Sequence, residues 1–288
     1  MNLLANHPFA KMNGAGNEIV VLDLRGDRAR VTPSDARAIA RARGLAYDQL
    51  MVLDAPRAAG SAAFMTIFNN DGSLSSACGN GTRCVAYMLT RDTDIRRLRL
   101  DTAAGPLECV RDGEFAFTVN MGPPRLDWRD IPLRDEARDT SAVWLNAPDL
   151  CPVFQTFCAV NMGNPHAVFF VDDPAAVDLA RIGPRIETDP IFPEKANVSI
   201  ARVLSRDHIN LRVWERGAGI TLACGTAACA TLVAAARKDL TDRAATVTLP
   251  GGDLRIEWRE SDGHVLMSGP VELEFEGRFD PAIFDGAD

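Results

Sequence analysis

Two copies of one sequence pattern follow each other along the chain, and this duplication constrains the fold more than any other feature. Residues 68–79 align without a gap with residues 214–225, and both segments end in Ala-Cys-Gly. The two cysteines, Cys78 and Cys224, are 146 positions apart (224 − 78 = 146). At nearly the same offset, residues 16–21 match residues 163–168, and Gly105 matches Gly252. Matches in one order at nearly one offset predict two similar structural units.

Each copy ends in the same way, which sets the expected limits of the two halves. An Asp-Gly pair typical of a hairpin turn is followed by a strand pattern and a Gly-Pro exit, at Gly122-Pro123 and again at Gly269-Pro270. We expect one half to comprise residues 1–122 together with 270–288, and the other to comprise residues 123–269. Since each half then carries one cysteine, we expect the active site in the cleft between them.

The pattern within each half predicts strands, one apolar helix and then further strands. The strand segments are rich in Val, Ile and Phe, and the helices are expected at about residues 80–90 and 226–238, directly after each Cys-Gly. Residues 226–236 are small or apolar on every side, so this helix has no face for solvent and should be buried. The expected fold class is α+β, with two pseudo-symmetric domains, each a curled, mostly antiparallel sheet around a central helix.

The composition narrows the range of functions. The 288 residues, 47% hydrophobic and 24% charged, can bury one large core or two ordinary ones. A net charge of −8 and a pI near 5.1 argue against a nucleic-acid partner and against an anionic membrane surface. No apolar run has the length of a transmembrane helix, and the first residues lack the pattern of a secretion signal. Seven cysteines without dense spacing predict reduced thiols, and we expect a cytoplasmic protein.

The chemistry is concentrated at Cys78 and Cys224, because each is expected at the N-terminus of a buried helix. Free N–H groups and the helix dipole stabilise a thiolate there by up to about 2 kcal/mol, which lowers the thiol pKa by about one unit. A second nearby thiolate is disfavoured by charge repulsion. We therefore expect one thiolate and one thiol at rest. Such a pair can remove a proton from one face of a carbon and return a proton to the other face.

The other five cysteines differ from Cys78 and Cys224 in their sequence context. Only Cys78 and Cys224 combine a following glycine with a duplicated helix-start position. We expect the other five to pack in the cores, namely Cys84, Cys109, Cys151, Cys158 and Cys229. No C-x-x-C occurs, and the four histidines have no ligand spacing, so we expect no metal site.

Several motifs resemble those of diaminopimelate epimerases. Residues 69–83 are similar to the family's first cysteine signature, and residues 215–226 are similar to its second. Further segments that resemble the family are residues 11–17, 47–50 and 163–166, and Asn197. The family fold, two similar halves with a sheet around a central helix in each, agrees with the repeat argument.

The resemblance implies interconversion of LL- and meso-diaminopimelate, a step that supplies lysine and cell-wall precursors. It also implies that neither pyridoxal phosphate nor any other cofactor takes part. The only lysines are Lys11, Lys195 and Lys238, and no phosphate-binding glycine loop accompanies them. The resemblance leads us to expect a small-molecule substrate and a homodimer.

The resemblance further implies which residues bind the substrate. Arg216 is expected to hold the distal carboxylate bidentately, and Glu215 to receive an ammonium group. His166 and Glu215 stand where the family has residues that tune the cysteine pKa values. The other expected contacts are backbone N–H groups on the reacting carboxylate, at Gly79, Asn80, Gly225 and Thr226, and the side-chain amides of Asn17, Gln49, Asn69, Asn164 and Asn197.

Three departures from the family pattern and two alternatives stay open at this point. Asn13 stands where histidine is common, Ile220 where an acidic residue is common, and Ala227 where glycine is usual, which affects the rate rather than the reaction class. A proline or hydroxyproline racemase would also use paired cysteines, but it recognises a ring amine and does not need Arg216 as a distal clamp. A thiol-redox switch protein would use the same two cysteines without epimerisation.

Overall fold

The structure, a computed structural model, describes residues 2–75, 78–147 and 149–285. Contacts divide the chain into two compact units, a first unit of residues 1–119 and 269–288 and a second unit of residues 120–268. The chain leaves the first unit at the end of strand β8 and returns to it within strand β17. The domain boundaries expected from the sequence, 122/123 and 269/270, lie three residues and one residue later.

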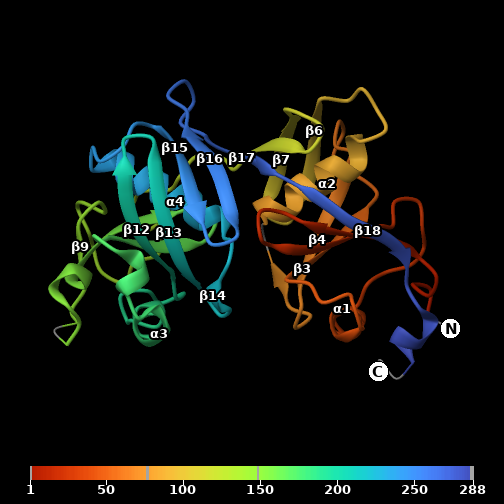
Figure 1. Ribbon diagram of the computed structural model, residues 1–288, viewed down its shortest axis with the longest axis horizontal. Coiled ribbons are helices and arrows are strands. Elements are labelled where there is room, and N and C mark those ends of the chain that lie inside the picture. The colour runs from red at the N-terminus through yellow and green to blue at the C-terminus, as the bar shows by residue number, and fades with distance from the viewer. Residues whose placement is uncertain (1, 76–77, 148, 286–288) are drawn as a thin grey trace. The chain divides into compact units, whose positions relative to one another are not determined.

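The two units contain the same series of elements (Figure 1). The first unit is built from β1 (Pro8–Asn13), β2 (Glu18–Asp23), α1 (Pro33–Arg41), β3 (Gln49–Asp54), β4 (Ala63–Asn69), β5 (Leu74–Ser75), α2 (Gly79–Thr90), β6 (Arg97–Thr102), β7 (Gly105–Arg111), β8 (Ala116–Asn120), β18 (Glu272–Arg278) and the 3-10 helix η3 (Pro281–Phe284). The second unit is built from β9 (Val143–Trp144), η1 (Pro152–Gln155), β10 (Thr156–Asn161), β11 (Pro165–Phe170), η2 (Pro174–Ala176), α3 (Leu179–Glu187), β12 (Asn197–Ser205), β13 (His208–Glu215), β14 (Gly219–Thr221), α4 (Gly225–Arg237), β15 (Ala244–Leu249), β16 (Gly252–Trp258) and β17 (Val265–Pro270). Among the described residues, no helix is long and apolar enough to cross a membrane.

Strand pairing repeats from one unit to the other. In the first unit, neighbouring strands run in the order β18-β1-β2-β3-β4-β6-β7, with β5 also on β4. In the second, the order is β9-β10-β11-β12-β13-β15-β16, with β14 on β13. Only β2–β3, β4–β6 and their equivalents β11–β12 and β13–β15 are parallel among these pairs. The prediction of mostly antiparallel sheets in an α+β fold is therefore confirmed.

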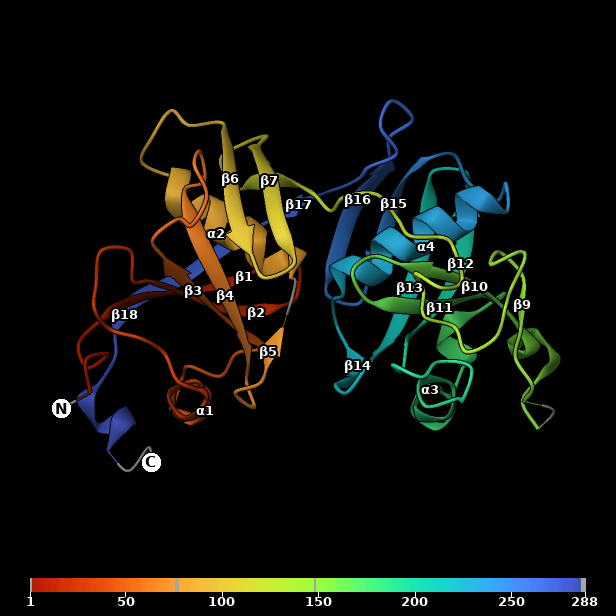
Figure 2. The same ribbon diagram turned by 180° about the vertical axis from the view of Figure 1, so that it is seen from behind.

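Each sheet curls around one buried helix, α2 or α4. Every residue of α4 from Gly225 to Ala235 is buried, and the helix contacts β10 to β13, β15 and β16 (Figure 2). Its alanines let the strands approach closely and lose no side-chain entropy on burial. Helix α2 is buried from Gly79 to Tyr87 and contacts β2, β3 and β7. Both central helices were predicted from sequence to within about one residue at each end.

A second core lies on the outer side of each sheet, where α1 or α3 packs. Strands β2 and β3 have four consecutive buried residues each, because α2 covers one face and α1 covers the other. Thr32 and Asp35 form a capping box that fixes the start of α1. Asp178 caps α3 by accepting the Arg181 N–H, and α3 packs on the phenylalanines Phe157 and Phe169 of β10 and β11.

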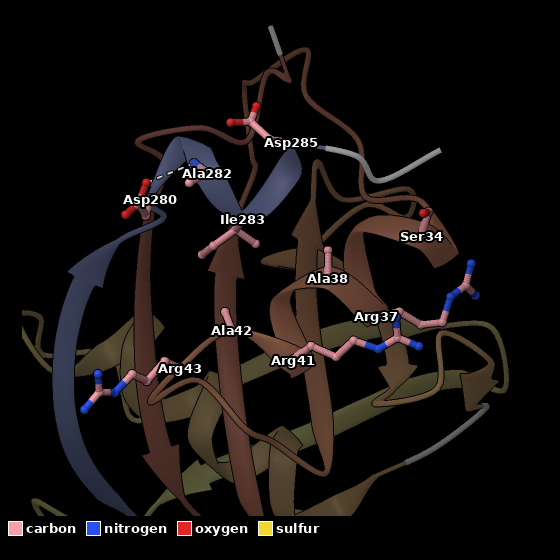
Figure 3. Close-up of a pocket in the computed structure, with 10 residues that line it drawn as sticks. All are labelled: Ser34, Arg37, Ala38, Arg41, Ala42, Arg43, Asp280, Ala282, Ile283 and Asp285. Carbon is pink, nitrogen blue, oxygen red and sulfur yellow. Dashed lines mark hydrogen bonds between the residues drawn. The ribbon is translucent and has the colours of Figure 1, made fainter.

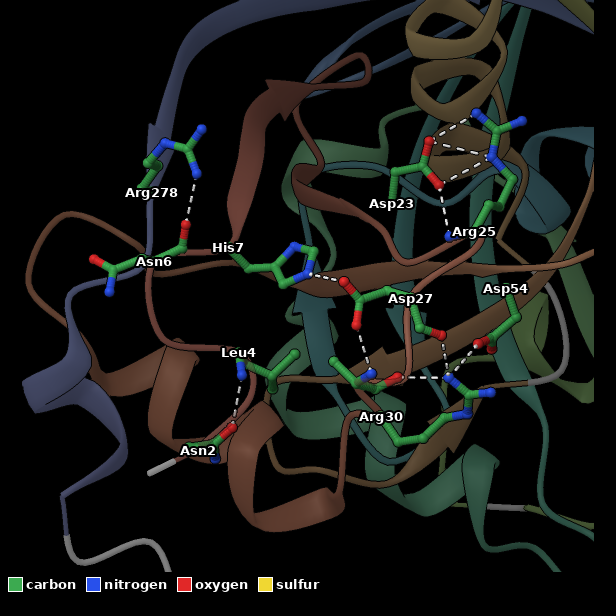
Figure 4. Close-up of polar contacts among 11 residues, drawn as sticks. Asn2, Leu4, Asn6, His7, Asp23, Arg25, Asp27, Arg30, Asp54 and Arg278 are labelled. Carbon is green, nitrogen blue, oxygen red and sulfur yellow. Dashed lines mark hydrogen bonds and ion pairs between the residues drawn. The ribbon is translucent and has the colours of Figure 1, made fainter.

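The chain ends meet in the first unit, which explains why residues 269–288 belong to it. Strand β18 pairs with β1, and Arg278 Nη1 donates to the Asn6 carbonyl at 2.8 Å. Figure 4 shows this contact beside the His7–Asp27 pair, whose Nε2 and Oδ2 are 3.0 Å apart. Asp27 also accepts the Ala29 N–H at 2.7 Å, so one carboxylate orders the turn after β2.

Gly183 of α3 provides a test of this packing. A Cβ atom at Gly183 would lie 2.5 Å from Cδ2 of Trp214, whose ring is held by its Nε1–H bond to Glu187. We expect Gly183→Ala to lower the free energy of unfolding by about 1–2 kcal/mol, because overpacking of about 1–3 kcal/mol outweighs the higher helix propensity of alanine. Denaturant unfolding measures this change. Gly113→Ala is the matched control, since a Cβ there makes only an ordinary contact at 3.6 Å, and equal effects of the two substitutions would contradict the packing argument.

Candidate active site

Cys78 and Cys224 are the N-cap residues of the two buried helices, as the sequence predicted. Their backbone angles are nearly the same, with φ −149° and ψ 102° at Cys78 and φ −144° and ψ 104° at Cys224. Cys78 is 9% exposed and Cys224 is 5% exposed. Each sulfur therefore stands at the N-terminal end of a helix whose first-turn N–H groups lack helical partners.

Cys78 belongs to a cluster of side-chain amides in the first unit. Its Sγ accepts the Gly81 N–H at 3.2 Å, and it lies 3.7 Å from the Asn17 Oδ1, to which the thiol donates. Gln49 and Asn69 are partners across β3 and β4, and the Gln49 Nε2 donates to the Asn69 Oδ1 at 3.3 Å. Asn80 is 2% exposed, at the start of α2. These residues meet at the ends of β2, β3 and β4 beside the α2 N-terminus.

Cys224 has a different set of neighbours in the second unit. Its Sγ lies 3.6 Å from the Thr226 Oγ1. Burial raises the pKa of the Cys224 thiol well above its usual value, and the Glu215 carboxylate raises it further, although the Thr226 hydroxyl and the Ala227 N–H act in the opposite direction. Glu215 is held in place by the Thr221 hydroxyl, which donates to its Oε1 at 2.5 Å.

At Cys224 the expected lowering of the thiol pKa by the helix N-terminus is outweighed by burial and by the Glu215 carboxylate. The helix N-terminus does act on the sulfur, but burial next to a carboxylate has a larger effect in the opposite direction. Burial and the nearby carboxylate therefore both favour the protonated thiol at Cys224. The Thr226 hydroxyl and the Glu215 carboxylate are the groups whose rearrangement would change its protonation.

His166 is fully buried, and its imidazole is neutral at physiological pH. Burial, with a contribution from the positive charge of Arg216, lowers the pKa of His166 to about 3. Its Nε2 is 2.8 Å from the Asn164 Oδ1, and its Nδ1 has no hydrogen-bond partner among the described residues. The proton is best placed on Nε2, because a buried N–H without a partner costs more than an unused acceptor. His166 then donates to Asn164 and leaves the Asn164 amide nitrogen for another partner.

Asn197 connects His166 to Arg216. Residues His166 and Asn197 are neighbours in the parallel pair of β11 and β12. The Asn197 side chain donates to the Pro165 carbonyl at 3.1 Å and accepts the Arg216 N–H at 2.9 Å, so it fixes the backbone where β13 ends. The exposed Arg216 guanidinium donates to the Glu194 carbonyl at 2.9 Å. Asn197 therefore fixes the backbone from which the Arg216 side chain extends.

The predicted site residues fall into two clusters, one in each unit. The first contains Asn17, Gln49, Asn69, Cys78, Gly79 and Asn80, and the second contains Asn164, His166, Asn197, Glu215, Arg216, Cys224, Gly225 and Thr226. Part of the first cysteine motif, residues 76–77, lies outside the described residues. Sequence reasoning missed Asp48, which binds Asn17, and Thr221, which binds Glu215. Asp48 lies within residues 47–50, the segment that resembles the family, and this resemblance was a signal for it.

The other cysteines mostly pack in the cores. Cys84, Cys109, Cys158 and Cys229 are buried, as predicted, whereas the prediction of core packing for Cys151 is wrong because this residue is exposed just before η1. Asn13, one of the departures from the family pattern, accepts the Gly16 N–H and so stabilises the turn between β1 and β2. Among the described residues, no three His, Cys, Asp or Glu side chains are grouped as metal ligands would be.

A separate pocket of about 540 Å³ lies between α1 and η3 (Figure 3). It is lined by Arg37, Arg41 and Arg43 and by Asp280 and Asp285, among others. None of the predicted site residues lines it. The candidate site therefore rests on the two cysteine clusters and not on this pocket.

Comparison with known proteins finds similar sequences over almost the whole chain. A family model described as diaminopimelate epimerase matches residues 9–126 and 158–274. A relative named diaminopimelate epimerase from Methylocella silvestris is 61% identical over 288 residues, which are 100% of this chain and 99% of the relative. One of the same name from Rhodopseudomonas palustris strain BisB18 is 57% identical with the same coverage. The solved hydroxyproline epimerase of Agrobacterium vitis is 14% identical, with a TM-score of 0.67 over 98% of this chain and 95% of that one, which shows a shared fold.

The neutral His166 predicts how stability depends on pH. Its folded pKa lies below the unfolded value near 6.5, so the unfolded state binds a proton first, and stability is lost as pH falls from about 6.5 toward 3. At pH 5 this group alone should cost about 2 kcal/mol relative to pH 7. Denaturant unfolding at both pH values should show a smaller difference for His166→Gln than for the unchanged protein. Equal differences in the two proteins would contradict a buried neutral imidazole.

The influence of Glu215 on Cys224 predicts a change in thiol reactivity. Glu215→Gln removes the carboxylate charge that raises the Cys224 pKa, so a larger fraction of the sulfur is thiolate at pH 8. We expect iodoacetamide to alkylate Cys224 several-fold faster, as measured by peptide mass spectrometry. Glu257→Gln, at an exposed position of β16, is the control and should leave the rate unchanged. An unchanged rate in Glu215→Gln would exclude this electrostatic coupling.

Proposed function

The chain belongs to the diaminopimelate epimerase family, and we infer that it converts LL-diaminopimelate to meso-diaminopimelate with Cys78 and Cys224 as its two bases. It is an isomerase that acts on a small molecule. The observation that supports the two-base assignment is the position of one buried N-cap cysteine at the same place in each of two repeated units.

We propose that one sulfur takes the α-proton of the substrate and the other returns a proton from the opposite face. The first sulfur, as a thiolate, removes the hydrogen of the α-carbon as a proton. The α-carbon then takes a proton from the second sulfur, which is a thiol. Proton transfer from both sides inverts the stereocentre without a change in oxidation state. The same two groups exchange roles in the reverse direction.

The carbanion needs stabilisation, and we propose that the helix N-termini provide it. Backbone N–H groups of the first turns of α2 and α4 point toward an anion at each helix start and carry the positive end of the helix dipole. They suit the reacting carboxylate, whose negative charge increases as the proton leaves. The proposed donors are Gly79 and Asn80 in α2 and Gly225 and Thr226 in α4.

We propose that substrate binding itself generates the thiolate at Cys224. Glu215 raises the Cys224 pKa, and an ammonium group of the substrate beside Glu215 neutralises that effect. The Cys224 thiol then releases its proton to solvent water more readily when the substrate is present. This role for Glu215 agrees with the family expectation that it tunes a cysteine pKa.

The distal end of diaminopimelate is proposed to be held by Arg216, with side-chain amides around it. The Glu194 carbonyl and the Asn197 amide fix the guanidinium and its backbone, which prepares Arg216 for a bidentate carboxylate contact. Asn164 offers its amide nitrogen because His166 occupies its oxygen. The remaining proposed contacts are Asn17, Gln49 and Asn69 from the first unit.

The reaction as proposed requires no cofactor, but it does require both sulfurs in the reduced state. A reducing compartment such as the cytoplasm suits this requirement, because thiols stay reduced there. A homodimer is proposed from the family resemblance, and sedimentation velocity would show it.

The decisive experiment follows deuterium uptake at the α-carbon of LL-diaminopimelate in heavy water, under reducing conditions and without added cofactor. We expect exchange and epimerisation by the unchanged protein, and the loss of epimerisation in Cys78→Ala and in Cys224→Ala because each removes one proton donor or acceptor. Proline and hydroxyproline should show no exchange.

Cys84→Ala is the control for thiol removal, since Cys84 is fully buried one turn and a half into α2 and should retain turnover. Full turnover in either single alanine variant at Cys78 or Cys224 would exclude that residue as a base. Exchange with proline but not with diaminopimelate would show that the protein has the activity of a proline racemase instead.

A further inference from the structure

Asn17 is held by the nitrogen of its side-chain amide. Its Nδ2 donates to the Asp48 Oδ2 at 2.8 Å, while its Oδ1 faces the Cys78 sulfur at 3.7 Å. The same Asp48 oxygen accepts the Glu18 N–H at 2.9 Å, and the Asp48 N–H donates back to the Glu18 carbonyl at 2.8 Å. Asp48 is therefore fixed to the start of β2 by two backbone hydrogen bonds and presents a carboxylate to Asn17.

The chemistry of these partners determines which way the amide points. A carboxylate only accepts hydrogen bonds, so the Asn17 group beside it must be the nitrogen. The oxygen is then left on the side of Cys78. A rotated amide would place its oxygen against the Asp48 carboxylate and lose a charge-assisted hydrogen bond.

The second unit shows the opposite arrangement at the equivalent position. Asn164 is the repeat partner of Asn17, and it is held by its oxygen, which accepts from His166. Gln49 and Asn197 begin the equivalent strands β3 and β12, so the residue that corresponds to Asp48 is Ala196. No carboxylate is available there. The two asparagines therefore present different atoms, an acceptor in the first unit and a donor in the second.

We propose that Asp48 is a positioning residue for Cys78. Asp48 holds the Asn17 amide so that the amide oxygen accepts the Cys78 thiol hydrogen. This inference rests on the proposed function, in which Cys78 is one of the two bases. An oxygen acceptor stabilises the protonated sulfur and disfavours the thiolate. Asp48 thereby prepares Cys78 as the proton donor of the pair while the active site is empty.

Charged groups of β1 and of α2 act on the Cys84 thiol, which also interacts electrostatically with Cys78. Lys11 of β1 and Arg83 of α2 both influence the neighbouring Cys84 thiol, and both favour a thiolate. These cations are the same in all the variants below. A difference in Cys78 reactivity among the variants therefore reports on Asn17 and Asp48.

The test measures iodoacetamide alkylation of Cys78 across pH 6–9 in the substrate-free full chain, resolved by peptide mass spectrometry. Asp48→Ala should raise the Cys78 rate at neutral pH by about threefold to tenfold, because the hydrogen bond from the thiol is lost. Asp48→Asn keeps an acceptor oxygen for Asn17 and should restore the original profile. Asn17→Ala should match Asp48→Ala, and the double variant should show no further increase.

Three controls separate this role from a general loss of structure. Cys84 is fully buried six residues after Cys78, and its alkylation should stay unchanged. Asp27→Ala also removes a carboxylate that accepts one backbone and one side-chain donor, and it should leave Cys78 unaffected. If Asp48→Ala does not fold, Asp48→Asn and Asn17→Ala still give opposite expectations.

Several outcomes would overturn the proposal. Equal rises in Asp48→Asn and Asp48→Ala would make the charge of Asp48 responsible rather than the orientation of Asn17. An independent effect of Asp48→Ala in the Asn17→Ala background would assign Asp48 a structural role, as would a parallel increase at Cys84. Because alkylation needs no turnover, these results are independent of whether diaminopimelate is the substrate.

Discussion

The burial of α2 and α4 inside their sheets is the constraint on which the site depends. A helix enclosed on all sides cannot rotate or slide without breaking contacts with several strands, so the residue at its N-terminus is fixed as well. Small side chains make this possible in α4, where alanine predominates. The sulfurs of Cys78 and Cys224 are therefore placed by the core and not by a mobile loop. Preorganised groups of this kind are what a proton transfer from carbon needs.

The two units kept the same backbone but acquired different polar partners. Their strands pair in the same order, and their helices begin with a cysteine in the same conformation. The neighbours differ, with Asn17 and Asp48 around Cys78 and with Glu215 and Thr226 around Cys224. The proposed reaction gives a reason for this divergence. In that reaction the two bases perform the same chemistry, but the substrate groups beside each of them differ, so identical surroundings could not suit both.

The duplication made much of the fold predictable from sequence. Two aligned Ala-Cys-Gly segments placed both helix starts, and the apolar faces of residues 226–236 predicted a buried helix, since burial of this kind follows from local pattern alone. The pKa of Cys224 was not predictable, because it depends on how completely the sheet encloses the sulfur and on Glu215, nine residues earlier. Asp48 was missed for a similar reason. Its contact with Asn17 depends on the parallel register of β2 and β3, which connects residues 31 positions apart.

A buried cysteine with a raised pKa is compatible with its proposed role as a base. The hydrogen on the α-carbon of an amino acid is a very weak acid, and the rate of its removal increases with the strength of the base. A thiolate formed inside the protein is poorly solvated and therefore more basic than one in water, although it is rarely populated without substrate. If Glu215 is neutralised by the substrate's ammonium group, the thiolate forms only when there is a proton to remove. Burial of Cys224 then increases base strength and also keeps the sulfur protonated, and so less reactive toward oxidants, in the empty site.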